Sequence, residues 1–568
     1  MFDEKTLEQC RKLMKQYEEA VAQRYQGKDF SSTTDSSGIP IKPLYTPLDI
    51  QDLDFEKDIG FPGTYPYLRS NYPIHYQFQP WINQPVHGYG LPEHTRERMD
   101  KLAAAGMEGY FGGRSYNIVC DVPTHFGVDP DEPDAQGYIG KDGVSCPTFE
   151  DFGRMLHDID LTKTNIVLIN GDTLAYLAHF IVYAETQGLK PNQLRGNTMN
   201  WQFGAWYASN HMWEPEGGLK LATDVIWFCS KEMPNWNHTN IQGHGMSESG
   251  ADAVHQMAYG IATAIAIADS CVAAGLDPDS FMPGIGFQIA QCNDFFEYIC
   301  MFRAWRKLWA NIAKERYGCK RASSMQLRTH THTSCFELTK QQPLVNLIRS
   351  SFHALGAALS GTTAMEVPAY DEPIGIPTEE SAILALRIQQ VIRHETGITK
   401  VSDPLAGSYY VEWLTHRMEQ EARKILKEIE DAGGFVRAHK NGMLMAELRK
   451  HSAQWRRSID KGERIIVGWN KYIVPEKEVI KPFRADPEVA KVAIARIKEF
   501  KAKRDQTKTD AALNALVAAA KRLDKGEYGH VMPACIEAAR ARATCGEISK
   551  TLRKVFKWGP EYTMAVQL

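Results

Sequence analysis

The chain has 568 residues, of which 43% are hydrophobic and 24% charged, and its formal net charge is −4. This balance is typical of globular proteins, and the length predicts two or three domains or one large barrel with additions. There is no long basic run, which argues against nucleic acid as the main partner, and no run of apolar residues long enough to predict a membrane span. The charged N-terminus does not resemble a signal peptide. The 11 cysteines include no Cys-x-x-Cys pair, which favours reduced thiols and a cytoplasmic protein.

Residues 1–55 are expected to form an N-terminal helix followed by an extended arm. The first 20 residues are charged and have an amphipathic helical pattern, whereas SSTTDSSGIPIKP, from residue 31, is rich in Ser, Thr and Pro. This segment precedes the main alternating pattern of the chain.

Residues 56–400 alternate short apolar runs with longer helical patterns. A predicted strand at 165–169 precedes a predicted helix from 173 to about 187, which Gly188 ends. The unit recurs, with a helix expected at 248–274, a strand at 285–289, a helix at 294–317 and a strand at 325–332. Repeated strand–helix units predict a parallel sheet, and about eight of them fit a closed (β/α)8 TIM barrel.

Residues 401–568 are expected to form a helical C-terminal extension. A pattern at 411–432 ends at Gly433-Gly434, and 511–523 is rich in alanine. The predicted fold class is therefore α/β: a TIM barrel with an N-terminal arm and a C-terminal helical extension.

Several strings stand where a predicted strand gives way to a helix, and in a βα barrel such loops form the catalytic face. Taken singly, each is equally well explained as a turn or a helix cap, and Asp294 and Thr378 are good N-cap residues. In chain order the strings are CDVPT (120–124), RG (195–196), NDFFE (293–297), QQP (341–343), YDE (370–372), PTEE (377–380) and DPLAGSYYVE (403–412).

Together the strings resemble the large subunits of the methylmalonyl-CoA mutase family of acyl-CoA mutases, collinearly from about Tyr65 to about Glu412. The resemblance implies an isomerase whose cofactor is adenosylcobalamin. It implies a barrel facing a flavodoxin-like cobalamin domain. There an adenosyl radical takes a hydrogen from the substrate and a group migrates to the neighbouring carbon. The protein binds and orients the substrate and excludes water.

We expect no cobalamin-binding domain on this chain. That domain carries an Asp-x-His-x-x-Gly loop in the family, and the nearest string, RAHKNG at 437–442, lacks the aspartate. His439 is interpreted as a solvated helix residue. The resemblance therefore implies a separate small cobalamin-binding subunit in a heterotetramer or similar hetero-oligomer, and a G-protein chaperone as a further partner.

The resemblance also implies site residues. Glu372 matches the carboxylate that holds the adenosyl ribose, Glu248 a glutamate near the corrin, and His330 a histidine of the substrate cavity. Two bland alternatives remain open: Glu248 could be a carboxylate at a helix N-terminus, and His330 a barrel histidine with satisfied hydrogen bonds. Cys120 and Asp142 are also assigned to the cofactor side.

The chain departs from the family pattern mainly around the substrate. Arginines and a threonine that hold the CoA nucleotide are replaced by Gln79, Gln84, Ile82 and Gly284, and glutamine cannot replace the charge of arginine. The remaining departures are Val86 for the tyrosine over the corrin, Lys220 for the arginine that reads a carboxylate, Met199 and His332 for two cavity glutamines, and His244 beside the expected histidine position.

These departures predict a substrate other than methylmalonyl-CoA. Lys220 and Val86 favour a bulky or branched acyl-CoA, and a substrate that is not a CoA ester is the alternative. An aromatic-rich segment fits a bulky apolar ligand, although core packing is the favoured interpretation; it contains Trp201, Phe203, Trp206, Trp213 and Trp227. Lys220 could instead be a surface lysine.

Two functions of other classes remain open. His330 and His332 alternate on a strand near Cys335, as in metal-dependent hydrolase or lyase barrels, but no matching carboxylate cluster is evident, so no metal site is predicted. The lost arginines would also suit a non-catalytic paralogue that binds a partner. The catalytic candidates are therefore His330, His244 and His332.

Overall fold

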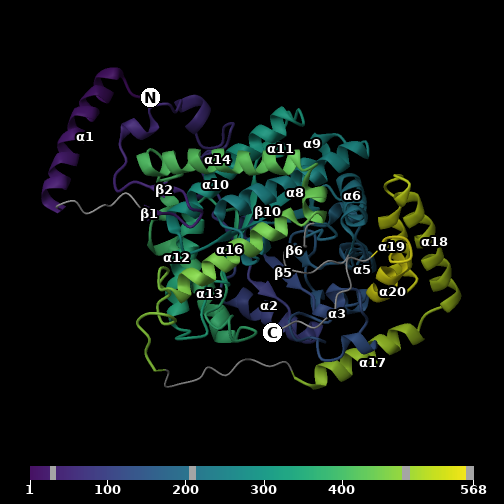
Figure 1. The fold of residues 1–568 in the computed structure, drawn as a ribbon. Coiled ribbons are helices and arrows are strands. Elements are labelled where there is room, and N and C mark those ends of the chain that lie inside the picture. Colours follow the sequence, from purple (N-terminus) through teal and green to yellow (C-terminus); the bar gives the residue numbers. More distant parts are fainter. Residues whose placement is uncertain (26–32, 204–212, 476–485, 558–568) are drawn as a thin grey trace.

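A ring of parallel strands forms the centre of the protein (Figure 1). The computed structural model describes residues 1–25, 33–203, 213–475 and 486–557. The strands of the ring are β3 (Ile82–Asn83), β4 (Val86–His87), β5 (Ser115–Val119), β6 (Asn165–Ile169), β7 (Gly196–Thr198), β8 (Trp236–Asn237), β9 (Thr239–Gln242), β10 (Ile285–Gln291), β11 (Arg328–Thr333) and β12 (Ala364–Glu366).

Two interrupted strands join two five-stranded sheets into one barrel. The sheets have the orders β3-β12-β11-β10-β9 and β4-β5-β6-β7-β8, with all neighbours parallel. Pro85, which has no N–H to donate, separates β3 from β4, and His238 separates β8 from β9. Across the second break, the Asn240 N–H donates to the Met199 carbonyl (3.2 Å). Counted as one strand each, the interrupted strands complete an eight-stranded (β/α)8 ring, as the sequence predicts.

Helices connect the strands and cover the outside of the ring (Figure 1). The predicted strand at 165–169 is confirmed as β6, and the following helix as α5. The helices between strands include α2 (Pro92–Ala104), α4 (Phe149–Leu156), α5 (Thr173–Thr186), α6 (Pro215–Glu232), α8 (Ala253–Ala273), α10 (Phe295–Glu315), α12 (Val345–Leu359) and α13 (Glu379–Glu395).

The helix predicted at 248–274 is wrong at its start. A short helix α7 (Gly243–Glu248) follows β9, and after a turn the Asp252 side chain accepts the His255 N–H to begin α8. Glu248 is thus the last residue of α7. The alternative that it complements the positive N-terminus of a helix therefore fails.

Within the described residues, α8 is long and apolar enough to cross a membrane by length and composition. However, 67% of its most apolar window is buried in the protein. Its residues pack in one hydrophobic cluster with Phe287, Trp305 and Trp309, as expected for a core helix.

The N-terminal helix α1 (Glu4–Tyr25) stands away from the body, and the hairpin of β1 (Thr33–Thr34) and β2 (Pro40–Ile41) returns to it (Figure 1). The arm docks at the start of α10, where Ser36 Oγ donates to Asp294 (3.1 Å) and the Ser37 N–H to Glu297 (2.9 Å). Asp294 precedes α10 as predicted, but its carboxylate accepts from the arm rather than capping its own helix.

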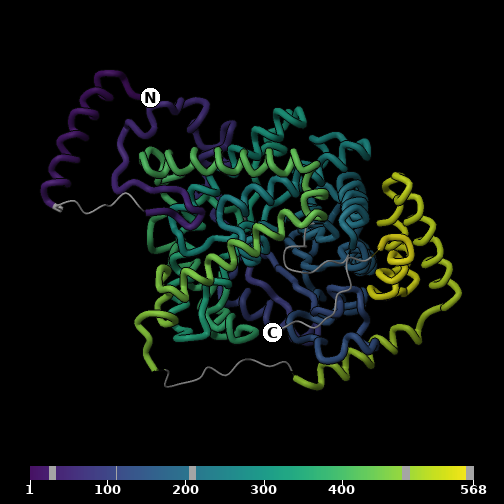
Figure 2. The backbone as a smooth tube through the Cα atoms, viewed as in Figure 1, coloured from purple at the N-terminus to yellow at the C-terminus, as the bar shows by residue number. Residues whose placement is uncertain are grey.

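The described residues after 400 are mainly helical, and the yellow helices α18–α20 lie on the side of the body opposite α1 (Figure 2). Buried Asp224 of α6 accepts the Val531 and Met532 N–H groups (3.1 and 3.0 Å), which fixes the start of α19 to the barrel. The helices are α14 (Tyr409–Asp431), α15 (Phe435–Lys440), α16 (Met443–Asp460), α17 (Glu488–Ala502), α18 (Gln506–Asp524), α19 (Val531–Arg540) and α20 (Cys545–Leu552).

A buried arginine anchors α14 to the barrel. The Arg303 side chain on α10 is 1% exposed and forms ion pairs with Asp403 and with Glu412 (2.7 Å). Arg69, from the segment before the barrel, also reaches Asp403 (3.2 Å). The conspicuous string at 403–412 therefore has a structural role: its two acids neutralise one buried guanidinium.

Arg303→Met should lower the free energy of unfolding by about 3–5 kcal/mol, because Glu412 would remain buried without its cation and Asp403 would keep only Arg69. Urea denaturation followed by tryptophan fluorescence measures the change. Lys427→Ala, which removes the exposed Lys427–Asp431 pair of α14, is the control and should change little. Equal effects of the two substitutions would contradict the anchoring role.

Candidate active site

A cavity of about 820 Å³ runs into the barrel from the amino-terminal ends of the strands. Its lining includes residues at the starts of strands, such as Asn165 and Asn237, and reaches inward to Asn240 and His330. The cavity therefore joins the lower mouth of the barrel to the histidine-bearing strand β11.

The mouth of the cavity is basic. Arg195 and Arg114 are exposed, and each stands directly before a strand, β7 and β5 respectively. Arg328 begins β11 and donates to Asn237 Oδ1 (2.5 Å), and Lys163 lies nearby in the same lining. Arginine forms paired hydrogen bonds with phosphate, so the mouth suits an anionic group.

The wall of the cavity includes polar side chains with atoms that have no hydrogen-bond partner among the described residues. They include Asn197 Oδ1, Asn240 Oδ1 and His330 Nε2. Leaving buried polar atoms unpaired costs free energy unless a ligand or water satisfies them. The wall therefore suits an elongated ligand with polar groups along its length.

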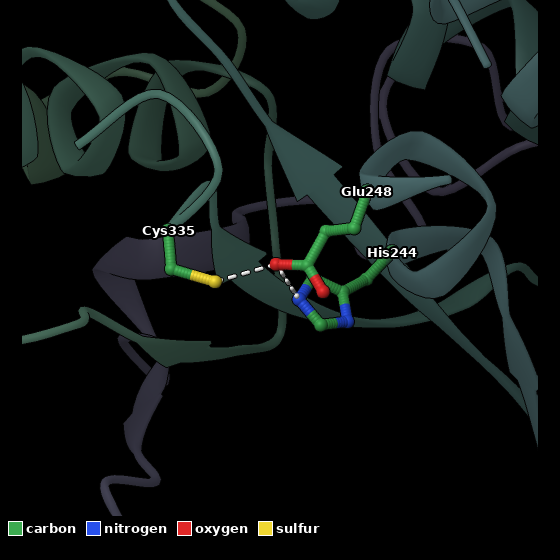
Figure 3. Close-up of side chains that lie close together, drawn as sticks. All are labelled: His244, Glu248 and Cys335. Carbon is green, nitrogen blue, oxygen red and sulfur yellow. Dashed lines mark hydrogen bonds and ion pairs between the residues drawn. The ribbon is translucent and has the colours of Figure 1, made fainter. Parts of the chain in front are cut away.

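Three potential ligating side chains converge at the opposite, carboxyl-terminal rim (Figure 3). His244 and Glu248 come from α7, after β9, and their Nε2 and Oε1 atoms are 3.0 Å apart. Cys335, after β11, donates from Sγ to the same Glu248 oxygen at 2.5 Å. Burial raises the pKa of Glu248, but the attraction and hydrogen bond of His244 outweigh it and the pKa falls to about 2.

His332 and Glu366 form a second pair at this rim. They stand opposite each other on β11 and β12, with His332 Nε2 3.3 Å from Glu366 Oε2. Burial lowers the pKa of His332 and raises that of Glu366, to which Glu372 and Glu248 add repulsion. Both shifts favour the uncharged forms of the two side chains. The His332 ring lies 4.0 Å from the His244 ring, centroid to centroid.

Glu372 lies in the loop after β12, where its backbone N–H donates to the Ala369 carbonyl. Its carboxyl group has no hydrogen-bond partner in the described part of the chain. The side chain is accessible to solvent but partly enclosed, and desolvation together with Asp371 and Glu248 raises its pKa to about 7. Asp371 beside it is buried and accepts the Thr378 N–H (3.1 Å), which leaves Glu372 as the carboxylate open to a ligand.

Strands β4 to β6 and the residues directly after β7 make one side of the barrel interior apolar. Val167, Ile169 and Met199 form a buried apolar cluster, against which Val86, Val119 and Trp201 pack. The Val86 N–H donates to Glu366 Oε1 (3.1 Å), so the apolar wall adjoins the histidine–glutamate rim. The interior is thus apolar on one side and polar and ionisable on the other.

Of the remaining predicted positions, Cys120 and Asp142 were expected on the cofactor side, and Gln84 and Gln79 on the substrate side. Cys120 is buried at the end of β5, where its Sγ accepts from Asn170 (2.8 Å), and Asp142 is exposed two residues before Val144, which bridges Cys120. Gln84 lines the cavity and donates to Ser115 Oγ (2.7 Å), whereas Gln79 lies outside that lining and donates to the Pro80 carbonyl.

Lys220 corrects a sequence-based prediction. Its Nζ donates to the carbonyl of Asp524 (2.6 Å) and pairs with the carboxylate of that residue (2.9 Å), at the end of α18. It therefore joins α6 to the C-terminal helices as a surface lysine and does not line the cavity. Of the aromatic segment, Phe203 and Trp213 are buried in the core, and Trp206 lies outside the described residues.

Several residues of this site are not among the candidates predicted from the sequence. Glu366 ends the short strand β12, and Arg114 and Arg328 stand at the starts of β5 and β11. All three could have been found from their positions at strand ends, because charged residues at the strand ends of a barrel face its two mouths. The eleven cysteines are all free thiols, as expected.

Comparison with known proteins identifies the family. The family model described as Methylmalonyl-CoA mutase matches residues 34–558. The chain is 35% identical to the methylmalonyl-CoA mutase of Escherichia coli over 92% of this chain and 71% of that protein. It is 34% identical to the human mitochondrial methylmalonyl-CoA mutase, over 91% of this chain and 68% of that protein. Its identity to the 2-hydroxyisobutanoyl-CoA mutase large subunit of Aquincola tertiaricarbonis is 34%, over 92% and 91%.

These matches confirm the predicted family, the α/β barrel class and the isomerase class. They extend through the barrel and through the C-terminal helices up to residue 558. The chain therefore belongs to the methylmalonyl-CoA mutase family, whose members are adenosylcobalamin-dependent isomerases.

Proposed function

We propose that this chain is the substrate-binding subunit of an adenosylcobalamin-dependent mutase that rearranges the carbon skeleton of a bulky or branched acyl-CoA. The observation that carries the proposal is the cavity of about 820 Å³ that joins a basic mouth to the histidine-bearing barrel interior. A CoA ester has phosphates at one end, a chain of amides in the middle and a reactive acyl group at the other.

The cavity matches these three parts in order. Arg114, Arg195 and Arg328 supply the cations for phosphate at the mouth. Asn197 and Asn240 line the middle section, and their side-chain oxygens have no partner among the described residues, so small movements would let them accept from amide N–H groups. Arg114 and Arg328 offer a replacement for the family's CoA-binding arginines, which are Gln79, Gln84 and Gly284 in this chain, whereas Arg195 belongs to a string that matches the family.

The carboxyl-terminal rim fits adenosylcobalamin. Glu372 offers an acid without a partner, whose two oxygens suit a pair of ribose hydroxyls, and Glu248 and Val86 lie at the same rim. When bound, the cofactor supplies the adenosyl radical that takes hydrogen from the substrate. The residues of this chain hold the substrate: His330, His332 and Glu366 offer polar side-chain atoms that can hydrogen-bond to the acyl group.

The apolar wall supports a bulky or branched acyl group. Val86, Val167 and Met199 provide contact surface for alkyl carbons, and valine occupies less volume than the tyrosine of the family pattern. Lys220 gives no support to this substrate class, since that lysine pairs with Asp524.

A second polypeptide completes the proposed enzyme. The relative from Aquincola tertiaricarbonis is named a large subunit, and the match covers 91% of it. We propose likewise that a small cobalamin-binding subunit covers the rim that holds Glu372 and Glu248, in a hetero-oligomer. A G-protein chaperone and a cytoplasmic location remain part of this proposal.

With its cobalamin-binding partner and adenosylcobalamin, the chain should isomerise branched acyl-CoAs faster than methylmalonyl-CoA. Carbon-13 NMR of labelled acyl groups detects the rearranged skeleton. The chain alone should lose the corrin on gel filtration. Preferred conversion of methylmalonyl-CoA would contradict the substrate assignment, and absence of any rearrangement across the panel would contradict the mutase assignment.

Arg195→Ala should raise KM for the acyl-CoA by roughly 10-fold or more with little change in kcat, because a hydrogen bond to a charged group contributes about 1.5–3 kcal/mol. The effect should vanish for acyl-pantetheine, which lacks the nucleotide phosphates. Lys190→Ala, an exposed lysine outside the cavity lining, is the matched control. An equal KM change for both thioesters would place the CoA phosphates elsewhere.

Glu372→Gln should impair turnover yet stabilise the chain alone at alkaline pH. Because the folded pKa is about 7 rather than 4.5, ionised Glu372 destabilises the folded state increasingly as pH rises from 4.5 to 7. The thermal midpoint of the variant should therefore exceed that of the wild type at pH 8 and match it near pH 5. The exposed Glu380→Gln serves as control. A pH-independent difference, or unchanged turnover, would remove Glu372 from the site.

A further inference from the structure

His244, Glu248 and Cys335 present one imidazole, one carboxylate and one thiol to the same point in space (Figure 3). Their candidate ligand atoms all lie within 4.8 Å of one another. They come from two separate loops, one after β9 and one after β11, so the barrel itself fixes their approach. Neither a helix end nor a single reactive cysteine accounts for the arrangement.

The three groups have the chemistry of a transition-metal site. Nitrogen, sulfur and carboxylate oxygen are the ligands of zinc, whose catalytic sites use three protein ligands and leave a fourth position open. The side chains of His244 and Glu248 are 12% and 31% exposed, so the point is shielded yet reachable. At present one Glu248 oxygen accepts both the His244 and Cys335 contacts.

Buried groups around the three candidate ligands are also poised for a ligand. His330 Nε2 has no hydrogen-bond partner among the described residues, and His330 is 7% exposed. The His332 ring packs against the His244 ring, with 4.0 Å between the ring centroids. His332 also pairs with Glu366 on the neighbouring strand β12. His330, which lines the cavity, stands two residues before His332 on β11, so the cluster lies at the rim beyond the inner end of the cavity.

The sequence supports a specific role for this chain. His244 and His332 are two positions at which it departs from the family pattern, and the fold brings both to the same rim as Cys335. Scattered neutral changes would not be expected to gather metal-binding side chains around one carboxylate.

We propose that His244, Glu248 and Cys335 bind a divalent transition-metal ion, with zinc as the best chemical match, and leave one position for an oxygen atom of the substrate. Binding converts the Cys335 thiol to a thiolate and releases its proton to solvent. The bound cation then withdraws electron density from a carbonyl or carboxylate oxygen in the cavity. The ion binds to the chain without cobalamin or CoA, so this proposal stands or falls separately from the mutase assignment.

The test uses the full chain, freed of metal by a chelator and desalted. Elemental analysis after equilibration with Zn²⁺ should give one retained ion per chain. Titration with Co²⁺ should give a thiolate-to-cobalt charge-transfer band in the near ultraviolet and visible bands with the intensity of a tetrahedral site. Absence of retained zinc in the wild type would overturn the proposal.

Substitutions locate the ion. Cys335→Ser should abolish the charge-transfer band, and both Cys335→Ser and His244→Gln should weaken Zn²⁺ binding by more than the roughly 10–100-fold typical of losing an outer-shell partner. Cys229→Ser is the matched thiol control, since Cys229 is buried on α6 and belongs to a different hydrophobic cluster from α7. Circular dichroism and the thermal midpoint verify that each variant is folded.

A second group in the described residues provides the decisive alternative. Asp252, His255 and His451 also lie within ligating distance of one another, but Asp252 already caps α8 and pairs with both histidines. His451→Gln should leave zinc binding unchanged. Loss of the ion from His451→Gln together with its retention by Cys335→Ser would move the site to α8 and overturn the assignment.

Discussion

Closure of eight parallel strands into one ring is the constraint on which the site depends. Parallel pairing sends every carboxyl end to one rim and every amino end to the other. Residues as distant in the chain as Val86, His244 and Glu366 therefore meet, while Arg114, Arg195 and Arg328 gather at the opposite mouth. The two interruptions, at Pro85 and His238, do not open the ring, because each broken strand pairs on both sides. The two rims of the barrel consequently differ in their chemistry.

The same ring separates the interior into two halves. Strands β4 to β7 contribute Val86, Val119, Val167, Ile169 and Met199, whereas β9 to β12 lead to glutamine, histidine and glutamate. Held beside one another, His332, Glu366 and Glu372 depart from their ordinary pKa values because burial and mutual repulsion oppose charge. Such a site destabilises the fold locally, and the buried Arg303 ion pairs and the large hydrophobic clusters around the barrel offset it.

Much of this fold could be predicted from the sequence, because alternation of apolar runs with helical patterns reports directly on β–α units. The strand Asn165–Ile169 and the helix after it follow from local pattern alone. The break between α7 and α8 was not predicted because both halves have helical periodicity, although Gly250, with φ of +113°, and the Asp252 cap separate them. Lys220 failed for a related reason: its position in a motif is local, but its partner Asp524 lies 304 residues away. Glu366 was overlooked because a three-residue strand has no detectable period.

Where the chain departs from the family pattern, the fold shows why the departures belong together. A cavity that loses arginine at Gln79, Gln84 and Gly284 must hold its anionic ligand by other cations, and Arg114, Arg195 and Arg328 stand at the mouth through which that ligand would pass. At the other rim, the ring centroids of His244 and His332 are 4.0 Å apart, and Glu248 and Cys335 lie at the same rim. Substitutions far apart in sequence thus alter the two rims of one barrel and leave the scaffold intact. That distribution is expected when selection changes the ligand rather than the reaction's architecture, since substrate contacts can be exchanged singly while a closed ring of strands cannot.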